Sequence, residues 1–134
     1  MGISVYISAT LRSFVNRNAR LEIEGTTVLE IERFNKHLML REIGVKGQKK
    51  IMAAKVLVIG LGALGSPVVQ YLAAAGVGTI GIADFDEVSL GNLQSQVIHG
   101  TRDVHRPKTA SARDSIKGIN PKIKIQVISQ LPTT

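Results

Sequence analysis

The feature that most constrains this sequence runs from Lys55 to Asp84, where a strand, a glycine turn, a helix, a second strand and an acid follow one another. Lys55–Ile59 is a short apolar run rich in β-branched residues, which predicts a strand buried on both faces, as in a parallel sheet. Thr79–Ala83 predicts a second buried strand, with Asp84 at its carboxyl end. This order is typical of a βαβ unit.

The turn between the first strand and the helix has the sequence Gly60-Leu61-Gly62-Ala63-Leu64-Gly65. Gly60 allows a tight turn, Gly62 lets the backbone approach a phosphate, and Gly65 lets the helix pack close to the strand. The helix N-terminus offers free N–H groups and a positive dipole end to an anion. Asp84 follows about 20 residues after the last glycine, where an acid can bind a ribose hydroxyl. We predict a nucleotide-binding turn; the alternative is a glycine-rich turn without a ligand.

The remaining C-terminal elements extend this pattern into an α/β sheet. The helix after the turn is predicted to bury Val68, Val69, Leu72 and Ala75 and to end at Gly76 and Gly78. A polar, acid-bearing segment then leaves the carboxyl edge of the sheet, where ligands bind in open parallel sheets. A helix over Lys108–Ile119 and a strand over Lys122–Ile128 follow. We expect the first mononucleotide-binding half of a Rossmann-like, doubly wound parallel sheet.

The N-terminal part of the chain has different patterns. Ile3–Ile7 and Leu21–Glu24 alternate apolar and polar residues, which predicts a β-hairpin within residues 1–28. Leu29–Leu40 has apolar residues at helical spacing and predicts one amphipathic helix that buries Ile31, Phe34 and Leu38. Arg41–Gln48, with two glycines, is predicted to be a loop, followed by a short helix over Gln48–Ala54.

Composition excludes several classes of protein. The sequence has no cysteine, which excludes disulfides and thiolate zinc sites. No apolar run approaches the roughly 20 residues of a membrane span, and Arg12 and Arg17 interrupt any signal-peptide pattern, so we expect a cytoplasmic protein without a membrane partner. The net charge of +7 is spread along the chain without an aromatic-interleaved patch. We therefore expect affinity for phosphates or an acidic partner rather than for nucleic acid.

Several motifs in residues 30–131 occur together with the spacing of one family. They are Arg33-Phe34-Asn35-Lys36, the glycine turn, Asp84-Phe85-Asp86-x-Val88-Ser89, Asn92-Leu93-Gln94-x-Gln96 and Pro107-Lys108. On these motifs the sequence resembles the first half of the ThiF/MoeB/HesA adenylyltransferases, relatives of the ubiquitin-activating enzymes. The Asp-x-Asp followed by Asn-Leu-Gln is far more specific than the glycine turn, because NAD enzymes do not ordinarily carry it.

The resemblance implies an activity. The family activates the C-terminal carboxylate of a small ubiquitin-like sulfur carrier of the MoaD/ThiS type, as in molybdopterin or thiamine biosynthesis. The carboxylate attacks the α-phosphate of ATP, bound with Mg²⁺, and pyrophosphate leaves. The protein positions the reactants and stabilises charge, so no protein nucleophile is required. The resemblance also implies a homodimer.

The resemblance assigns roles to individual residues. It implies a catalytic set of Lys36, Asn92 and Lys108, with no metal-ligating residue. The implied cofactor-binding residues are Gly60, Gly62, Ala63, Gly65, Asp84, Asp86, Gly91, Asn92, Leu93, Gln94, Ser95 and Lys108. Each also has a plain structural interpretation: Asp84 as a turn cap, Asn92 as a loop residue, Lys108 as a solvated lysine. A cation in the first turn of a helix opposes the helix dipole, which favours a functional role for Lys108.

The sequence also departs from the family pattern. Lys36 and Ser95 stand where the family has arginine, and Ala63 stands where it has glycine. The family continues to a magnesium-binding aspartate, a carrier-docking surface and often a Cys-x-x-Cys zinc site, which this sequence does not contain. We therefore expect a chain that at most binds ATP by itself. The alternatives are a non-catalytic nucleotide-binding remnant or module and half of an NAD-dependent oxidoreductase.

The first hairpin has its own resemblance. Thr10-Leu11-Arg12 and Glu24-Gly25-Thr26-Thr27-Val28 resemble the opening hairpin of the MoaD/ThiS sulfur carriers. We expect residues 1–28 to be a hairpin, carrier-like or simply packed on the domain, and residues 29–134 to be a truncated ThiF-type nucleotide-binding domain. An uncovered sheet face and an open third-strand edge predict dimers or aggregation.

Overall fold

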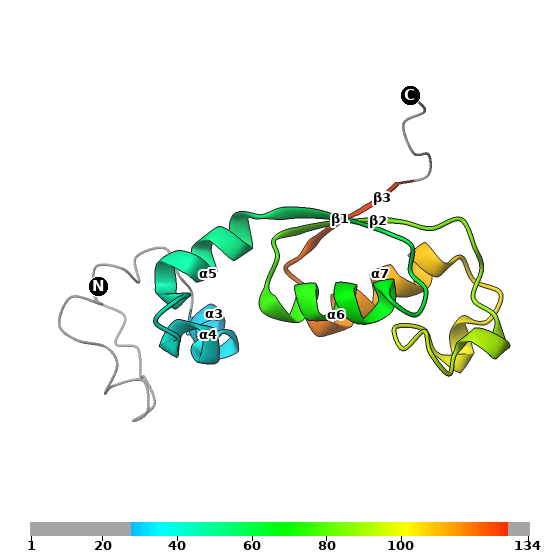
Figure 1. Ribbon diagram of the computed structural model, residues 1–134, viewed down its shortest axis with the longest axis horizontal. Coiled ribbons are helices and arrows are strands. Elements are labelled where there is room, and N and C mark those ends of the chain that lie inside the picture. Colours follow the sequence, from blue (N-terminus) through cyan, green and yellow to red (C-terminus); the bar gives the residue numbers. More distant parts are fainter. Residues whose placement is uncertain (1–27, 129–134) are drawn as a thin grey trace. The chain divides into compact units, whose positions relative to one another are not determined.

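A computed structural model describes residues 28–128 of the chain (Figure 1). The chain divides into two compact units, residues 1–50 and residues 51–134. The predicted hairpin strands, Ile3–Ile7 and Leu21–Glu24, lie outside the described residues. The division into a hairpin over 1–28 and a domain over 29–134 therefore stays a prediction.

The first unit contains short helices in place of the single helix predicted over Leu29–Leu40. Helix α3 spans Val28–Arg33 and helix α4 spans Asn35–Met39. Phe34 separates them, because its backbone (φ −106°, ψ 15°) leaves the helical region. Ile31 and Phe34 are buried as predicted, whereas Leu40 is exposed.

The predicted loop over Arg41–Gln48 is wrong for most of its length. Helix α5 spans Gly44–Ala53, so the loop covers only residues 41–43. Gly44 starts this helix at φ 55° and donates its N–H to the Leu40 carbonyl at 2.8 Å. Gln48 is buried, and its Oε1 lies 2.8 Å from Nδ1 of His37. The helix forms despite the low helix propensity of its two glycines, and this contact joins it to α4.

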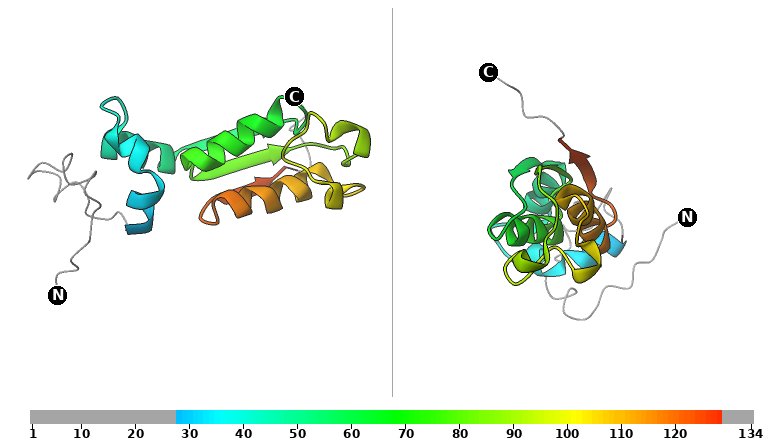
Figure 2. Two further views of the ribbon diagram at one scale, coloured as in Figure 1. Left: turned by 90° about the horizontal axis from the view of Figure 1, so that it is seen from below. Right: turned by 90° about the vertical axis from the view of Figure 1, so that its right-hand side faces the viewer.

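The second unit is the predicted α/β half-sheet. Its elements are strand β1 (Lys55–Ile59), helix α6 (Gly65–Ala75), strand β2 (Thr79–Ala83), 3₁₀ turns η1 (Leu90–Asn92) and η2 (Thr101–Asp103), helix α7 (Lys108–Ile119) and strand β3 (Lys124–Val127). The strands are parallel in the order β1-β2-β3, with Leu57 opposite Gly81 and Ile59 opposite Ala83. Figures 1 and 2 show α6 and α7 side by side against the same face of the sheet. This arrangement confirms the Rossmann-like fold class and leaves the other face without a helix from the described residues of this unit.

The core lies between the sheet and these helices. Its fully buried side chains include residues from three elements: Val69 and Ala73 on α6, Ile80 and Ile82 on β2, and Ala112 and Ile116 on α7. For α6 the predicted face is partly wrong. Val69 is buried as expected, but Val68 is exposed and Ala73 is buried. The buried α6 positions Ser66, Val69 and Ala73 follow the i, i+3, i+7 spacing of one helix face.

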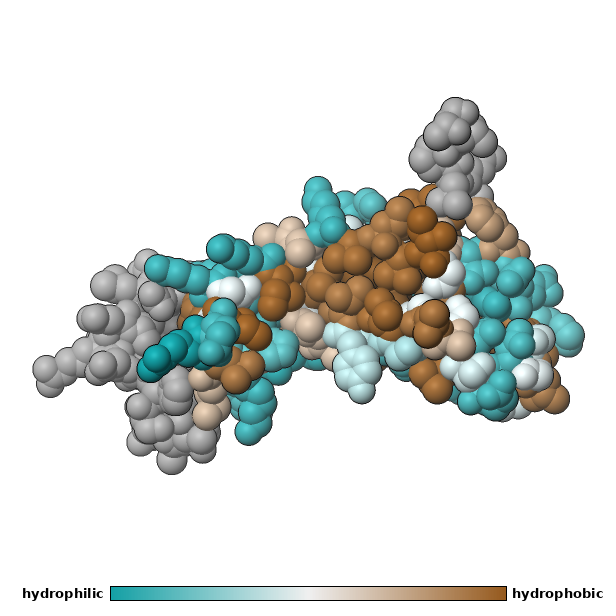
Figure 3. All heavy atoms as spheres, viewed as in Figure 1, coloured by the Kyte–Doolittle hydropathy of each residue, from teal (hydrophilic) through white to brown (hydrophobic). Residues whose placement is uncertain are grey.

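The prediction that both strands are buried on two faces holds for β2 and is wrong for β1. Val58 is 8% exposed, but its neighbours Leu57 and Ile59 are 52% and 63% exposed. Successive strand residues point to opposite faces, so this contrast separates a helix-covered face from an open face. In the view of Figure 3 apolar side chains gather over β1 and α6. The exposure of Leu57 and Ile59 confirms the expectation of an uncovered apolar sheet face within the described residues.

Candidate functional site

The glycine turn stands at the carboxyl edge of the sheet, where β1 ends. Gly60 adopts φ 87°, a left-handed conformation that favours glycine, and its N–H donates to the Ala83 carbonyl at 2.8 Å. A Cβ at Gly65 would overlap the Gly60 carbonyl, so only glycine lets α6 begin this close to β1. Leu64, the N-cap residue of α6, provides no side-chain cap. The turn thus presents uncapped backbone N–H groups, as an anion site requires.

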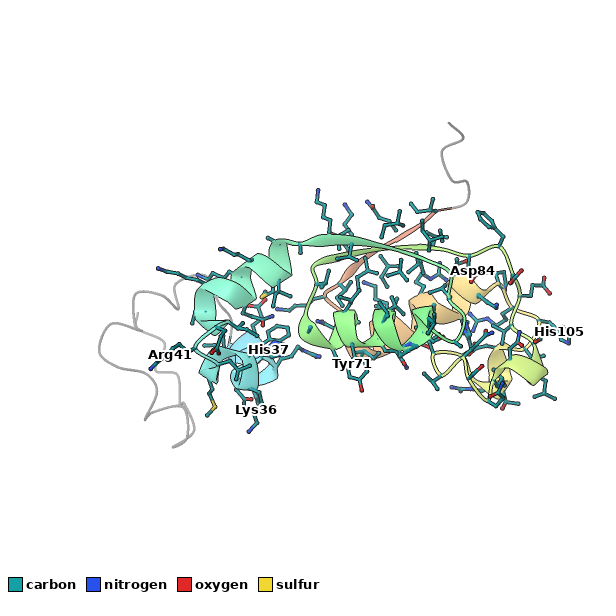
Figure 4. All side chains as sticks on the ribbon, viewed as in Figure 1. Lys36, His37, Arg41, Tyr71, Asp84 and His105 are labelled. Carbon is teal, nitrogen blue, oxygen red and sulfur yellow. The ribbon has the colours of Figure 1, made fainter. Side chains whose placement is uncertain are left out.

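Asp84 ties this turn to the loop after β2 (labelled in Figure 4). Its Oδ2 accepts the Leu61 N–H at 2.6 Å, and its Oδ1 accepts the Asp86 N–H at 2.9 Å. The turn-capping interpretation of Asp84 is therefore correct. A ribose role stays compatible with it, because each carboxylate oxygen has a second lone pair.

Lys108 reaches the same edge because the loop after β2 pairs with the segment before α7. Glu87 bridges to Pro107 in antiparallel fashion, and the Lys108 N–H donates to the Asp86 carbonyl at 2.9 Å. The Lys108 Nζ lies 3.3 Å from Asp86 Oδ2. The lysine side chain is 5% exposed and that of Asp86 is 77% exposed. The interpretation of Lys108 as a solvated lysine is wrong, since its ammonium is buried in the first turn of α7.

The predicted nucleotide loop, Gly91–Ser95, begins in the η1 turn. Gly91 and Gln94 are exposed, while Asn92, Leu93 and Ser95 are half-buried. The Ser95 Oγ donates to the Asn92 carbonyl at 3.4 Å, and the Gln94 amide donates to Ser95 Oγ at 3.3 Å. These contacts shape the loop itself, and the contacts of these residues with a nucleotide stay a prediction.

Gln96 belongs to the motif but was not assigned to the site. It is buried, and its Nε2 lies 3.9 Å from the position that a Cβ on Gly62 would occupy. Its Oε1 is buried without a hydrogen-bond partner in the described part of the chain. A buried carbonyl without a partner is costly, so its place beside the turn points to contact with a ligand or water. The last position of Asn-Leu-Gln-x-Gln was the available sequence signal.

His99 is a second residue that the sequence analysis missed. Its ring is buried, with Nε2 at 3.1 Å from the Leu61 carbonyl oxygen and Nδ1 at 2.8 Å from Ser111 Oγ. Burial is the main cause that lowers the pKa of His99. A lone histidine in a predicted loop gave no sequence signal for a contact with the glycine turn.

The predictions about Lys36 and about a metal do not concern the residues described so far. Lys36 is exposed on α4, in the unit formed by residues 1–50, so its role toward a nucleotide stays a prediction. Within residues 28–128 no group of three or more His, Asp or Glu side chains could hold a metal ion. No helix in the same range is long and apolar enough to cross a membrane.

A family model settles the class of protein. The model described as the ThiF family matches residues 34–133. The chain belongs to the ThiF family. The matched range includes the glycine turn, the Asp84–Gln96 motifs and Lys108.

Relatives of known name are considerably longer than this chain. It is 58% identical over 98 residues to the probable adenylyltransferase/sulfurtransferase MoeZ of Mycobacterium tuberculosis, covering 73% of this chain and 25% of that protein. It is 46% identical over 97 residues to the molybdopterin-synthase adenylyltransferase of Haemophilus influenzae, covering 72% and 40%. The solved complex of the E. coli tRNA N6-threonylcarbamoyladenosine dehydratase TcdA with ATP has a TM-score of 0.72 and 27% identity, over 80% of this chain and 43% of that one.

Proposed function

We propose that this chain is the ATP-binding part of an adenylyltransferase that activates the C-terminal carboxylate of a ubiquitin-like sulfur carrier. The observation that carries the proposal is the joining of the glycine turn, Asp84 and buried Lys108 at one sheet edge in a ThiF-family chain. The names of the relatives support adenylyl transfer, and the TcdA complex supports ATP as the nucleotide. The carrier type, MoaD or ThiS, is part of the proposal.

In this proposal nucleotide binding is divided among a few groups. The N–H groups of residues 62–65 bind phosphate oxygens, helped by the helix dipole, because those of Gly60 and Leu61 are already bonded to Ala83 and Asp84. Lys108 neutralises charge that develops on the phosphates, because the one carboxylate paired with its buried ammonium within residues 28–128 is that of exposed Asp86. Asp84 shapes the turn and takes a ribose hydroxyl with its remaining lone pairs. Asn92 and the loop through Ser95 lie along the nucleotide.

The reaction itself asks for positioning rather than for a nucleophile on the protein. The carrier carboxylate attacks the α-phosphate, a carboxyl–phosphate bond forms, and the bond to the leaving pyrophosphate breaks. Mg²⁺ enters as the Mg-ATP complex and lowers the charge of the triphosphate. In this proposal the chain acts as a homodimer in the cytoplasm, and Lys36 reaches the nucleotide of the second copy.

Calorimetric titration of the purified chain with Mg-ATP, with NAD as the comparison ligand, tests nucleotide binding. We expect saturable ATP binding that Lys108→Ala and Asp84→Ala each weaken by about tenfold or more, as loss of a charge-assisted contact does. Lys124→Ala removes an exposed lysine of β3 with the same charge and is the matched control. Binding of NAD without ATP would favour the oxidoreductase alternative. Failure of a folded chain to bind either nucleotide would reject the proposal.

A second candidate is a nucleotide-binding module without adenylyl transfer. Ser95 and Lys36, where the family has arginine, favour it, because each change removes guanidinium contacts to phosphate. Exchange of labelled pyrophosphate into ATP is measured with a carrier protein present. Exchange by this chain would reject the module. ATP binding without exchange fits both candidates, because the proposed function assigns this chain only the ATP-binding part of the enzyme.

A further inference from the structure

The peptide group between Leu61 and Gly62 is held from the buried side of the turn. The Leu61 carbonyl accepts hydrogen bonds from His99 Nε2 at 3.1 Å and from Ser66 Oγ at 3.2 Å. The Leu61 N–H donates to Asp84 at 2.6 Å, and the Leu61 side chain is fully buried. Contacts from Asp84, which follows β2, from α6 and from the segment before α7 therefore converge on one residue of the turn.

Hydrogen-bond accounting fixes the protonation state of His99. A carbonyl only accepts, so Nε2 must carry the proton. Nδ1 of a neutral ring is then an acceptor, and the Ser111 hydroxyl, at 2.8 Å, donates to it. Burial and the charge of Lys108 lower the pKa of His99, while Asp103 and Asp84 act in the opposite direction. The neutral ring with its proton on Nε2 is therefore the form at neutral pH.

The geometry of a trans peptide carries this contact to the ligand side. The carbonyl of Leu61 and the N–H of Gly62 belong to one planar unit and point in opposite directions. A carbonyl fixed toward buried His99 directs the Gly62 N–H away from the core. A Cβ at Gly62 would meet nothing closer than the Gln96 amide at 3.9 Å, so the turn is not crowded at this residue.

We propose that His99 is a positioning residue for the nucleotide: its Nε2–H holds the Leu61 carbonyl and thereby aims the Gly62 N–H at the bound phosphate. The inference rests on the proposed function for the nature of the ligand. His99 itself does not touch the nucleotide. Ser111 acts behind it, since its hydroxyl fills Nδ1 and keeps the ring proton on Nε2.

Two substitutions at one position test the inference on the full chain. His99→Met fills similar volume without a donor, whereas His99→Gln keeps an N–H where Nε2 stood. We expect His99→Met to weaken Mg-ATP binding by about tenfold and to speed amide exchange at Gly62, and His99→Gln to stay within about threefold of the parent chain. If His99 only filled space in the core, the donor of His99→Gln would not restore the ATP affinity. A folded His99→Met chain with parental Gly62 exchange and parental affinity would overturn the inference.

A measurement on the unmodified chain covers the case in which His99→Met does not fold. Imidazole nitrogen NMR of the labelled protein is expected to show His99 with its proton on Nε2 at neutral pH, with His37 and His105 as internal references. A proton on Nδ1 would overturn the inference, because Nε2 then cannot donate to Leu61. If the parent chain binds no ATP, the proposed function fails, while the ring tautomer and Gly62 exchange still decide whether His99 holds the turn.

Discussion

The two faces of the sheet have opposite environments. Ile80 and Ile82 on β2 face the helices and are fully buried, whereas Leu57 and Ile59 on β1 face the other way and are more than half exposed. The glycine turn takes its contacts from β2, from α6 and from the segment before α7. The glycine turn at the carboxyl edge of the sheet therefore depends on contacts on the helix-covered side. It forms although no helix of this unit covers the open face.

The largest loss of stability is expected at Gly65, where α6 begins close to the end of β1. In Gly65→Ala the added Cβ would overlap the Gly60 carbonyl, so α6 must move from β1. We expect a loss of about 3 kcal/mol or more in the free energy of unfolding, measured by urea denaturation. Gly62→Ala is the control, since its Cβ meets only the Gln96 amide at 3.9 Å and is expected to cost less than about 1 kcal/mol. Equal losses would show that the turn is not packed as described.

Matched truncations compare the two faces directly. Ile82→Ala on the covered face is expected to cost about 2–5 kcal/mol, because a fully buried isoleucine leaves a cavity. Ile59→Ala, at a residue 63% exposed, is expected to cost less than about 1 kcal/mol by the same denaturation measurement. A large loss for Ile59→Ala would mean that another segment or copy covers the open face in solution.

Self-association provides a more sensitive test of the open face. Ile59→Gln places a polar side chain among the exposed apolar ones and leaves the helix-covered core intact. We expect the parent chain to form dimers or aggregates in sedimentation velocity, and the variant to shift toward monomer at the same concentration. The variant should keep the parental unfolding transition within about 0.5 kcal/mol. A parent chain that stays monomeric at high concentration would contradict the predicted dimer.

Lowering the pH is expected to reduce the free energy of unfolding gradually, through buried His99 on the helix-covered side of the sheet. The pKa of buried His99 is lowered in the folded chain, whereas the unfolded chain titrates near 6.5. The unfolded chain binds more protons below that pH, so the free energy of unfolding falls as pH drops from about 6.5 through the folded pKa. The slope for one proton is at most about 1.4 kcal/mol per pH unit. His99→Gln should lack this slope, and a parental slope in that variant would assign it to another group.

A second decrease in stability, at lower pH, is expected from the carboxylates of Asp103 and Asp114 near α7. The Gly100 N–H and Arg106 hold the pKa of Asp103 below its usual range, and Arg106 does the same for Asp114. Their stabilisation is present above about pH 4 and is lost as pH falls through the folded pKa values. Because Asp114 is exposed, its share is expected to be small and to decrease in high salt.

The sequence predictions were accurate where local signals determine the structure. They missed features that depend on contacts between residues distant in sequence. The bounds of β1, β2 and α7 were predicted to the residue, because apolar runs between glycines, Pro107 and Asn120 are local signals. The break at Phe34 and the start of α5 at Gly44 were missed, because the second depends on the contact between His37 and Gln48. At the site, Asp84 and Lys108 were identified from motifs, whereas the roles of Gln96 and His99 required side-chain neighbours distant in sequence.

The sequence alone determined the family, the βαβ order and the glycine positions, because backbone conformation and close approach leave few residue choices there. The tertiary structure decided which face of β1 is covered, since alternation gives two faces but does not say where helices pack. It also decided that Asp84 caps the turn, that Lys108 is buried beside Asp86 and that His99 holds Leu61. These are contacts between residues 22 to 38 positions apart, and their geometry exists only after the sheet has formed.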